Sequence, residues 1–265
     1  MEAEKNLGLR DILSSVRGIY LPLYLAQADI KQRYRRSVLG PFWITISTGV
    51  MVACLGGIFG NLFKTPLFEI LPFIASGLII WGLISGCLTD ATTVFCSSEA
   101  IIKQLPIPLF THILRMVARN FYIFLHNLII IPIVLLFVQR PVGFNFLYFF
   151  PGILVLILNL LWFSLVLAIV CARYRDLTQI VINVLQIFFY LTPIIWMPNA
   201  LEGRSRSFVL DSNPFYHLME IVRAPIMNSA PTLLNWIVSI SILVVGWIAS
   251  ILIFNRYKRK IAYWL

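Results

Sequence analysis

Six long apolar stretches constrain the fold of this chain more than any other feature of its sequence. Each has about the 20 residues that an α-helix needs to cross the hydrocarbon of a bilayer. Their hydropathy is continuous rather than alternating, which favours helices over the strands of a closed barrel. We therefore predict an all-α membrane protein with six transmembrane helices in one domain, residues 1–265. The predicted spans are Gly40–Phe63, Leu67–Leu88, Met116–Val138, Phe146–Cys171, Leu177–Met197 and Leu233–Phe254.

The composition excludes an ordinary soluble domain. Only 12% of the residues are charged, against about 25% in a typical soluble protein, and the mean hydropathy is +0.88. The cysteines lie in or beside apolar stretches and form no C-x-x-C pair, so we interpret them as packing residues and expect no disulfide and no metal site. They are Cys54, Cys87, Cys96 and Cys171.

The basic residues predict the orientation. An even number of spans puts both termini on one side, and that side then holds 16 of the 21 lysines and arginines. The positive-inside rule therefore places both termini in the cytoplasm. We divide the chain into a cytoplasmic segment 1–39, a membrane region 40–254 and a cytoplasmic tail 255–265. The net charge of +10 is explained by this topology and by lipid headgroups, and it does not require nucleic acid as a partner.

Three connections are predicted to contain helices that do not span the membrane. Pro22–Ser37 is expected to form a moderately amphipathic helix at the cytoplasmic surface, with Leu23, Ile30 and Tyr34 on one face and Asp29 paired with Arg33. Ser98–Leu105 is expected to form a short helix that Ser97 or Ser98 caps and Pro106 ends. The connection 198–232 is long and rich in proline, and we expect short helices in it at the outer surface.

The membrane interior contains few groups that could couple transport to ions. His126 is the only titratable side chain expected deep inside the bilayer, and we interpret it as a hydrogen-bonding residue between helices. The chain has no G-x-x-x-x-G-K-[ST] stretch, so it carries no P-loop. Any ATP would therefore be hydrolysed by another subunit.

Aromatic residues gather at the ends of the first and fifth predicted spans. Phe59 and Phe63 are near the outer end of the first, and Phe188, Phe189, Tyr190 and Trp196 are in the fifth. Such groups are typical of interfacial belts that face lipid. They would equally suit a track for sugars, because flat rings stack on the C–H faces of pyranoses.

Four segments resemble, in kind and order, those of ABC-2 type permeases that export O-antigen and related cell-surface polysaccharides. The first is Asp29–Trp43, which reads DIKQRYRRSVLGPFW and leads into the first span. The others are Ile102–Pro108, Arg173–Leu177, and Thr192–Trp196 followed by Asn213–Tyr216. The resemblance covers most of the chain and implies an ABC-2, type V exporter-like fold.

The resemblance also implies partners. Two copies of the chain would form a homodimer that binds two copies of a separate ATPase, and ATP and Mg²⁺ would be used by that partner, with no cofactor in this chain. The residues at the ATPase interface would be Glu99, Ile101, Ile102, Lys103, Arg33, Arg35 and Arg36. The residues along the substrate path would be Trp43, Phe59, Phe63, Phe189, Tyr190 and Trp196.

The implied function is export of a lipid-linked polysaccharide, with O-antigen as the first candidate, across a bacterial inner membrane. An exporter of teichoic acid or capsular polysaccharide is the alternative within the class. A membrane-embedded glycosyl- or acyltransferase is the alternative from another class, and its candidate residues would be Asp90, Glu99 and His112. An ion-coupled carrier is disfavoured by the interior chemistry described above.

The orientation can be tested in intact cells after the native cysteines have been removed. A cysteine introduced at Ser205 should react with an impermeant thiol reagent, because residue 205 lies in the predicted outer connection. A cysteine introduced at Lys258 should be protected until the membrane is permeabilised. The reverse labelling pattern would contradict the six-span topology.

Overall fold

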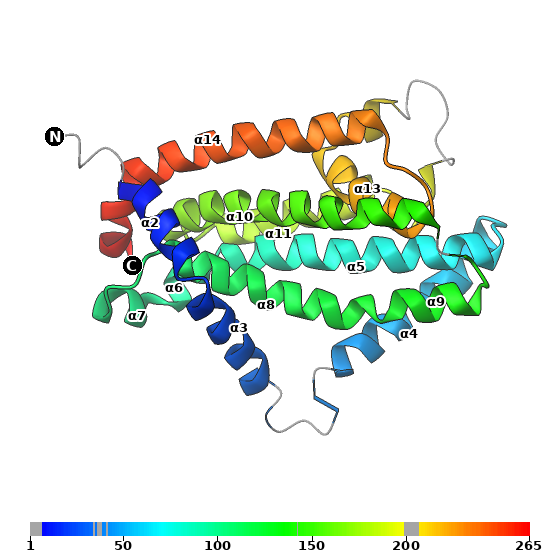
Figure 1. Ribbon diagram of the computed structural model, residues 1–265, viewed down its shortest axis with the longest axis horizontal. Coiled ribbons are helices and arrows are strands. Elements are labelled where there is room, and N and C mark those ends of the chain that lie inside the picture. Colours follow the sequence, from blue (N-terminus) through cyan, green and yellow to red (C-terminus); the bar gives the residue numbers. More distant parts are fainter. Residues whose placement is uncertain (1–6, 34, 36–38, 41, 142, 199–206) are drawn as a thin grey trace.

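The computed structural model describes residues 7–33, 35, 39–40, 42–141, 143–198 and 207–265 (Figure 1). Within these ranges every regular element is a helix, as the hydropathy pattern predicts. Arg36 of the predicted ATPase interface and Ser205 of the labelling experiment lie outside the described residues.

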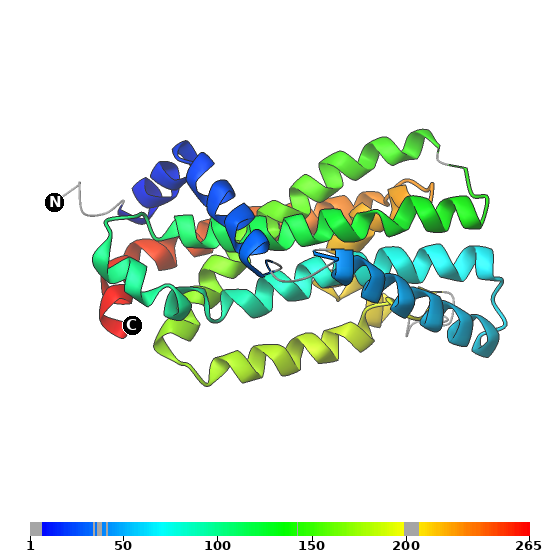
Figure 2. The ribbon, with the colours of Figure 1, turned by 90° about the horizontal axis from the view of Figure 1, so that it is seen from below.

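Among the described residues, five segments are long and apolar enough to cross a membrane. They are α4 (Phe42–Leu62), α5 (Leu67–Ala91), α8 (Phe110–Leu128) continued by α9 (Ile130–Phe137), α10 (Phe149–Arg173) preceded by the 3₁₀ turn η1 (Phe144–Tyr148), and α14 (Leu233–Trp264). They run side by side along the long axis of the molecule (Figures 1 and 2). Helix α5 lies at the centre, since 67% of its apolar window is buried compared with 17% of that in α4.

The observed helices correct several predicted boundaries. The third predicted span begins six residues too late, because α8 already starts at Phe110 and includes Arg115. The last helix continues to Trp264, ten residues past the predicted end at Phe254. The fifth predicted span is represented by α11 (Leu177–Leu191), an apolar helix of 15 residues. It ends two residues before Pro193, because proline disfavours the helical conformation of the residue before it.

Buried polar side chains hold the chain where α11 ends. Asn213 donates from its amide to the Thr192 hydroxyl at 2.8 Å and caps α13 (Pro214–Ile226) by accepting from the backbone N–H groups of Phe215 and Tyr216. Arg223 of α13 donates to the carbonyl oxygen of Pro193, and its guanidinium lies 4.2 Å from the centre of the Phe73 ring on α5. The predicted helix in the connection 198–232 is therefore present as α13.

The N-terminal segment forms two helices, α2 (Leu7–Arg17) and α3 (Tyr20–Arg33). The predicted helix over Pro22–Ser37 thus begins two residues earlier and ends by Arg33. The residues of α3 that pack against the rest of the chain are Pro22, Ala26 and Ile30, whereas Leu23 of the predicted apolar face is exposed. Tyr34 lies outside the described residues.

Helix α2 joins the N-terminal segment to the last helix, α14, and to the start of α8 through polar contacts. The side chain of Asn255 on α14 accepts the backbone N–H of Gly8 at 2.7 Å. The Asp11 carboxylate accepts the N–H groups of Leu109 and Phe110 at 3.1 and 2.9 Å and pairs with Lys258 at 2.9 Å. Asp11 therefore caps α8 from a distant segment, and the N-terminal helices lie at the same end as the C-terminal part of α14.

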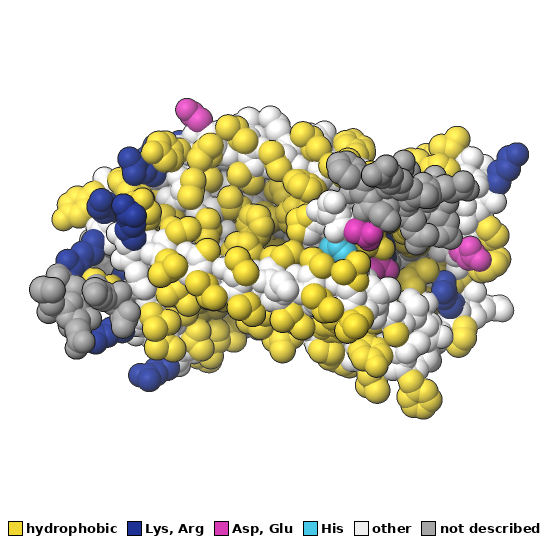
Figure 3. Space-filling model, turned by 90° about the horizontal axis from the view of Figure 1, so that it is seen from above, with side chains coloured by type: hydrophobic (Ala, Val, Ile, Leu, Met, Phe, Trp, Pro, Cys, Tyr) yellow, Lys and Arg dark blue, Asp and Glu magenta, His cyan; other side chains and the backbone are white. Residues whose placement is uncertain are grey.

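Charge is distributed unevenly along the bundle. Figure 3 shows lysine and arginine side chains gathered at the end that carries the termini, with apolar side chains over the middle of the same face. On this face the basic side chains are therefore more numerous at the end that carries the termini, as the sequence predicts. The predicted hydrogen bond of His126 to a neighbouring helix is corrected for one ring nitrogen. Its Nδ1 lies 2.7 Å from the carbonyl oxygen of Tyr122, which belongs to the same helix.

The contribution of Arg223 can be measured by thermal unfolding of the purified protein in detergent. The variant Arg223→Met should lower the free energy of unfolding by about 3–5 kcal/mol. The reason is that the Glu220 carboxylate, which lies 3.0 Å from Arg223 Nε in the native protein, is left without its cation. The double variant Arg223→Met, Glu220→Gln should recover part of that loss, since the unpaired charge is gone. The exposed Arg10→Met variant is the control and should shift stability by less than about 0.5 kcal/mol. An unchanged transition in Arg223→Met would refute this role.

Candidate functional site

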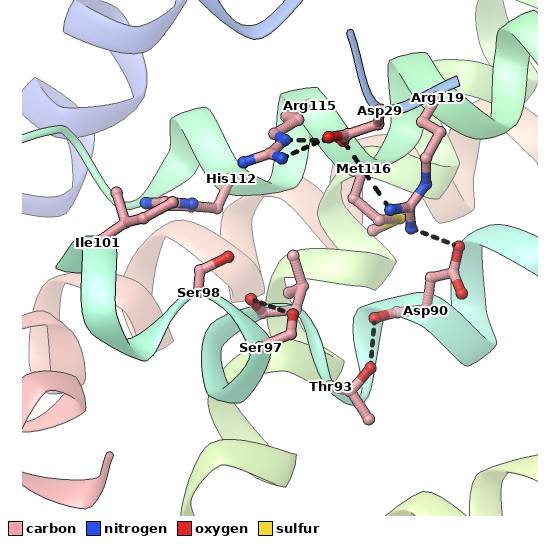
Figure 4. A pocket seen from close by; sticks show the side chains of 11 residues that line it. Asp29, Asp90, Thr93, Ser97, Ser98, Ile101, His112, Arg115, Met116 and Arg119 are labelled. Atoms are coloured by element: carbon pink, nitrogen blue, oxygen red, sulfur yellow. Dashed lines mark hydrogen bonds and ion pairs between the residues drawn. The ribbon is translucent and has the colours of Figure 1, made fainter. Parts of the chain in front are cut away.

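A polar cavity of about 260 Å³ lies at the end of the bundle that carries the termini. Its walls come from α3, from α8, and from the end of α5 with the short helices α6 (Val94–Ser97) and α7 (Glu99–Gln104) (Figure 4). Segments far apart in the sequence therefore meet here. The lining residues are Asp29, Asp90, Thr93, Val94, Ser97, Ser98, Ile101, His112, Arg115, Met116 and Arg119.

Two arginines of α8 hold the walls of this cavity together. Arg115 makes two hydrogen bonds to the Asp29 carboxylate of α3, one of them 2.8 Å from Nε to Oδ2. Arg119 pairs with Asp90 of α5 at 2.9 Å and lies 4.0 Å from Asp29. Asp90 also accepts from the amide of Asn120 at 2.8 Å. The predicted pair of Asp29 with Arg33 is therefore wrong, because Asp29 faces α8 instead of the next turn of its own helix.

Two residues of the cavity wall carry a buried polar atom that has no hydrogen-bond partner in the part of the chain that the structure describes. These atoms are Nε2 of His112, a buried residue, and Nε of Arg119. Buried polar groups are normally hydrogen-bonded to protein or to ordered water. A cavity of this size with such groups in its wall is suited to hold water or a polar group from a partner.

Helix α7 confirms the predicted short helix but not its cap. Ser98 is the residue before the helix, yet its hydroxyl caps no backbone N–H among the described residues. The helix ends at Gln104, and Leu105 is extended ahead of Pro106. The side chains of Glu99 and Lys103 pair at 2.6 Å on the exposed surface, and this hydrogen bond to the ammonium group lowers the pKa of the Glu99 carboxyl.

The predicted interface residues of α7 do not all face outward. Ile102 packs against the hydrophobic core, and Ile101 lines the polar cavity. The exposed side of the segment is formed instead by Ala100, Lys103, Gln104 and Leu105, of which Leu105 is 52% exposed. The sequence pattern could not distinguish these sides, because six residues are too few to establish a helical periodicity.

The predicted basic residues of the N-terminal segment lie elsewhere. Arg33 and Arg35 are exposed, and Arg33 lines a second cavity of about 370 Å³ beside Asp29, Asp90 and Arg119. Helix α3 leads away from α7 toward the start of α4 (Figure 1). The structure therefore brings Arg33 to the charged network and not to α7.

The predicted substrate-path residues lie on α4, on α11 and just after α11. Phe59 and Phe63 stack at 5.6 Å near the end of α4, and Trp43 is exposed at its start. Phe189 packs against Trp81 of α5, whereas Tyr190 is 59% exposed. The indole N–H of Trp196 donates to the carbonyl oxygen of Tyr190 at 3.0 Å. Both helices pack on α5 and leave much of their surface uncovered.

The residues considered for an enzyme are not assembled as a catalytic group. Asp90 is held by Arg119 and Asn120, and Glu99 pairs with Lys103 outside the lining of the cavity. Only Asp90 and His112 share the cavity. The sequence analysis missed two features near the site. These are the cap that Asp11 forms on α8 and the pairing of Asp29 with Arg115 and Arg119. No local sequence signal exists for either, because the partners are far apart in the chain.

Comparison with known proteins adds independent findings. The model of a family described as ABC-2 type transporter matches residues 22–227. A Klebsiella pneumoniae protein named O-antigen export system permease protein RfbA is 24% identical over 250 residues, which are 91% of this chain and 93% of that protein. A Myxococcus xanthus protein of the same name is 24% identical over 216 residues, which are 79% of this chain and 82% of that protein.

Proposed function

The chain belongs to the ABC-2 type transporter family, and from this premise we propose that it is the membrane-spanning subunit of an ATP-driven exporter of O-antigen. The observation that carries the proposal is the family match over residues 22–227. It is supported by the similarity, along most of their length, to relatives that are named O-antigen export permeases. The cargo would be a lipid-linked polysaccharide that crosses the inner membrane without any bond being made or broken in this subunit.

The proposal includes a separate ATPase and a second copy of the chain. The sequence has no P-loop, so a partner must bind and hydrolyse ATP with Mg²⁺. Helix α4 buries only 17% of its apolar window within the chain, and α11 likewise has mostly exposed side chains. Two uncovered helices on α5 support a homodimer, in which these surfaces would meet each other or enclose the cargo path.

The proposed topology has six spans and both termini in the cytoplasm. Helix α11 is about 22 Å long at 1.5 Å per residue, less than the ~30 Å of hydrocarbon, so residues 192–197 and α13 would complete the crossing on its outer side. The tight packing of α2 against the end of α14 supports termini on one side. The concentration of basic side chains at that end supports the cytoplasmic assignment.

We propose that α7 transmits the movement of the ATPase into the membrane. Its exposed side, with Lys103 and Leu105, is available to a partner. Its inner side is joined to the bundle through Ile102, which packs against the core, and through Ile101 in the wall of the cavity that Arg115 and Arg119 close. Helix α7 packs on α6 and α14, and α6 packs on α5, α8 and α10, so a displacement of α7 would act on α14 directly and on the other three helices through α6.

The coupling proposal is tested by the double variant Lys103→Glu, Leu105→Asp. These exposed positions are preferable to Ile101 and Ile102, where aspartate would also disturb the protein's own packing. An unpaired carboxylate buried in a partner groove costs several kcal/mol, so recovery of the ATPase with the purified subunit should fall more than tenfold and export should stop. The matched control, Tyr263→Asp at an 89% exposed site near the C-terminus, should retain both. Normal recovery and export in the double variant would contradict the role of α7.

A sugar path along α4 and α11 is tested at the rings of Phe59, Phe63, Phe189 and Tyr190. Alanine should slow export modestly at single sites and strongly in pairs across the two helices, because stacking on a sliding polymer is the sum of weak contacts. Leucine should rescue positions that only face lipid but not positions that stack on sugar. Phe63 and Tyr190 are the most informative, since both are well exposed, and Phe144→Ala at a 94% exposed site is the control. Native export rates in all four leucine variants, at equal protein levels, would contradict the sugar path.

A further inference from the structure

An apolar groove of about 760 Å³ opens on the side of the bundle between the end of α8 with α9 and the segment that leads from α9 through η1 to α10. Figure 2 shows α10 diverging from α9 toward the end opposite the termini, with α13 lying between them. Ile226 at the end of α13 forms part of the floor, Leu128, Ile129 and Leu136 form one wall, and Phe146 of η1 belongs to the other. The groove has the volume of a typical ligand site, which is about 300–1,000 Å³.

The main wall of the groove is the stretch from the end of α8 into α9. Helix α8 ends at Leu128 and α9 begins at Ile130, with Ile129 between them in the helical conformation, and Pro132 in the first turn of α9 supplies no backbone N–H. Ile129 and Leu136 in this wall are exposed apolar residues, as expected of a surface that faces hydrocarbon.

A single basic side chain, Arg140, lines the outer end of the groove. Its backbone N–H donates to the carbonyl oxygen of Leu135 at 3.0 Å, and Nη2 of its guanidinium donates to the carbonyl oxygen of Met227 at 2.9 Å. These bonds fix the arginine at the point where the chain leaves α9. Among the described residues none of the ion pairs includes Arg140, so its charge is not neutralised within that part of the chain.

We propose that this groove is a binding site for an anionic phospholipid, with an acyl chain along Ile129 and Leu136 and the phosphate at Arg140. An arginine guanidinium can donate to a phosphate through two N–H groups, and it is the usual choice for phosphate recognition. The apolar walls exclude a water-soluble anion as the main ligand. The site goes beyond the proposed export activity and does not depend on it.

The position of the groove argues against a second copy of the chain as its occupant. The proposed dimer surface consists of α4 and α11, and neither helix contributes a lining residue to the groove; Figure 2 places α9 on the side of the bundle away from α11. A second apolar groove, of about 430 Å³ between α4 and α9, provides an internal comparison. Residues such as Gly49, Val52 and Ile133 line it, with no charged side chain among the described residues that form its wall, so wherever α4 is not covered by a second copy this groove should accept acyl chains without a preference for the headgroup.

The test measures lipid binding to the purified full-length protein in detergent by native mass spectrometry. The probes are phosphatidylglycerol and phosphatidylcholine with identical acyl chains, and a polyprenyl phosphate as a separate arm. The native protein should prefer phosphatidylglycerol. Arg140→Gln should weaken phosphatidylglycerol binding about tenfold, which corresponds to one charge-assisted hydrogen-bonding contact. Arg140→Lys should restore part of the binding, because the charge is retained but the paired donation of the guanidinium is lost.

Two tryptophan variants separate the groove from the charge. Ile129→Trp fills the proposed site and should displace the lipid even though Arg140 is intact, whereas Ile133→Trp fills the second groove one turn away and should leave the headgroup preference unchanged. The proposal is overturned by equal binding of both phospholipids to the native protein, or by native affinity in Arg140→Gln. Preferential retention of the polyprenyl phosphate would also overturn it, by assigning the groove to a lipid carrier.

Discussion

The fold depends on the requirement that every backbone polar group in hydrocarbon finds a partner within the protein. Helix α11 ends at Leu191, and in the proposed six-span topology the backbone groups at this end would lie in hydrocarbon. Arg223 meets this requirement from α13 by donating to the carbonyl oxygen of Pro193, and Asn213 joins the same two segments through a side-chain hydrogen bond to the Thr192 hydroxyl. The position of α13 against the end of α11 is therefore set by hydrogen bonds and not by hydrophobicity alone.

The same requirement is met differently at the other end. Helix α8 begins with N–H groups that no local serine or aspartate caps, and Asp11 accepts them from α2. Because Asp11 also pairs with Lys258, one carboxylate joins three helices. The neighbouring network of Asp29, Arg115 and Arg119 fixes α3 to the same region. In the proposed transporter, this end would respond to the ATPase as one unit.

Burial within the chain is uneven, and the helices with the fewest buried residues are the two that we propose for the dimer surface or the cargo path. The centre of the bundle is α5, whereas α4 and α11 have few buried residues. Gly56 and Gly60 let α4 approach α5 closely, since an added Cβ at Gly56 would lie 2.4 Å from Leu71. Gly49 and Gly57 have open space beside them. The first pair thus serves packing within the chain, while the second leaves a smooth surface on the exposed side.

The sequence alone determined the class of fold, most of the helices and their approximate ends. A continuous apolar stretch favours a helix, and proline disfavours its continuation, whatever the rest of the chain does. It also predicted α7 and the charge asymmetry for the same reason. Only the tertiary structure decided which polar groups meet: Asp29 bonds Arg115 instead of Arg33, and Asp11 caps α8. It also decided which side of α7 packs against the core, where Ile102 lies. Such contacts join residues about 90 to 250 positions apart, and each participant, taken singly, resembles an ordinary charged residue at the end of a span. Their pairing follows from how the helices pack, which depends on all of the helices together.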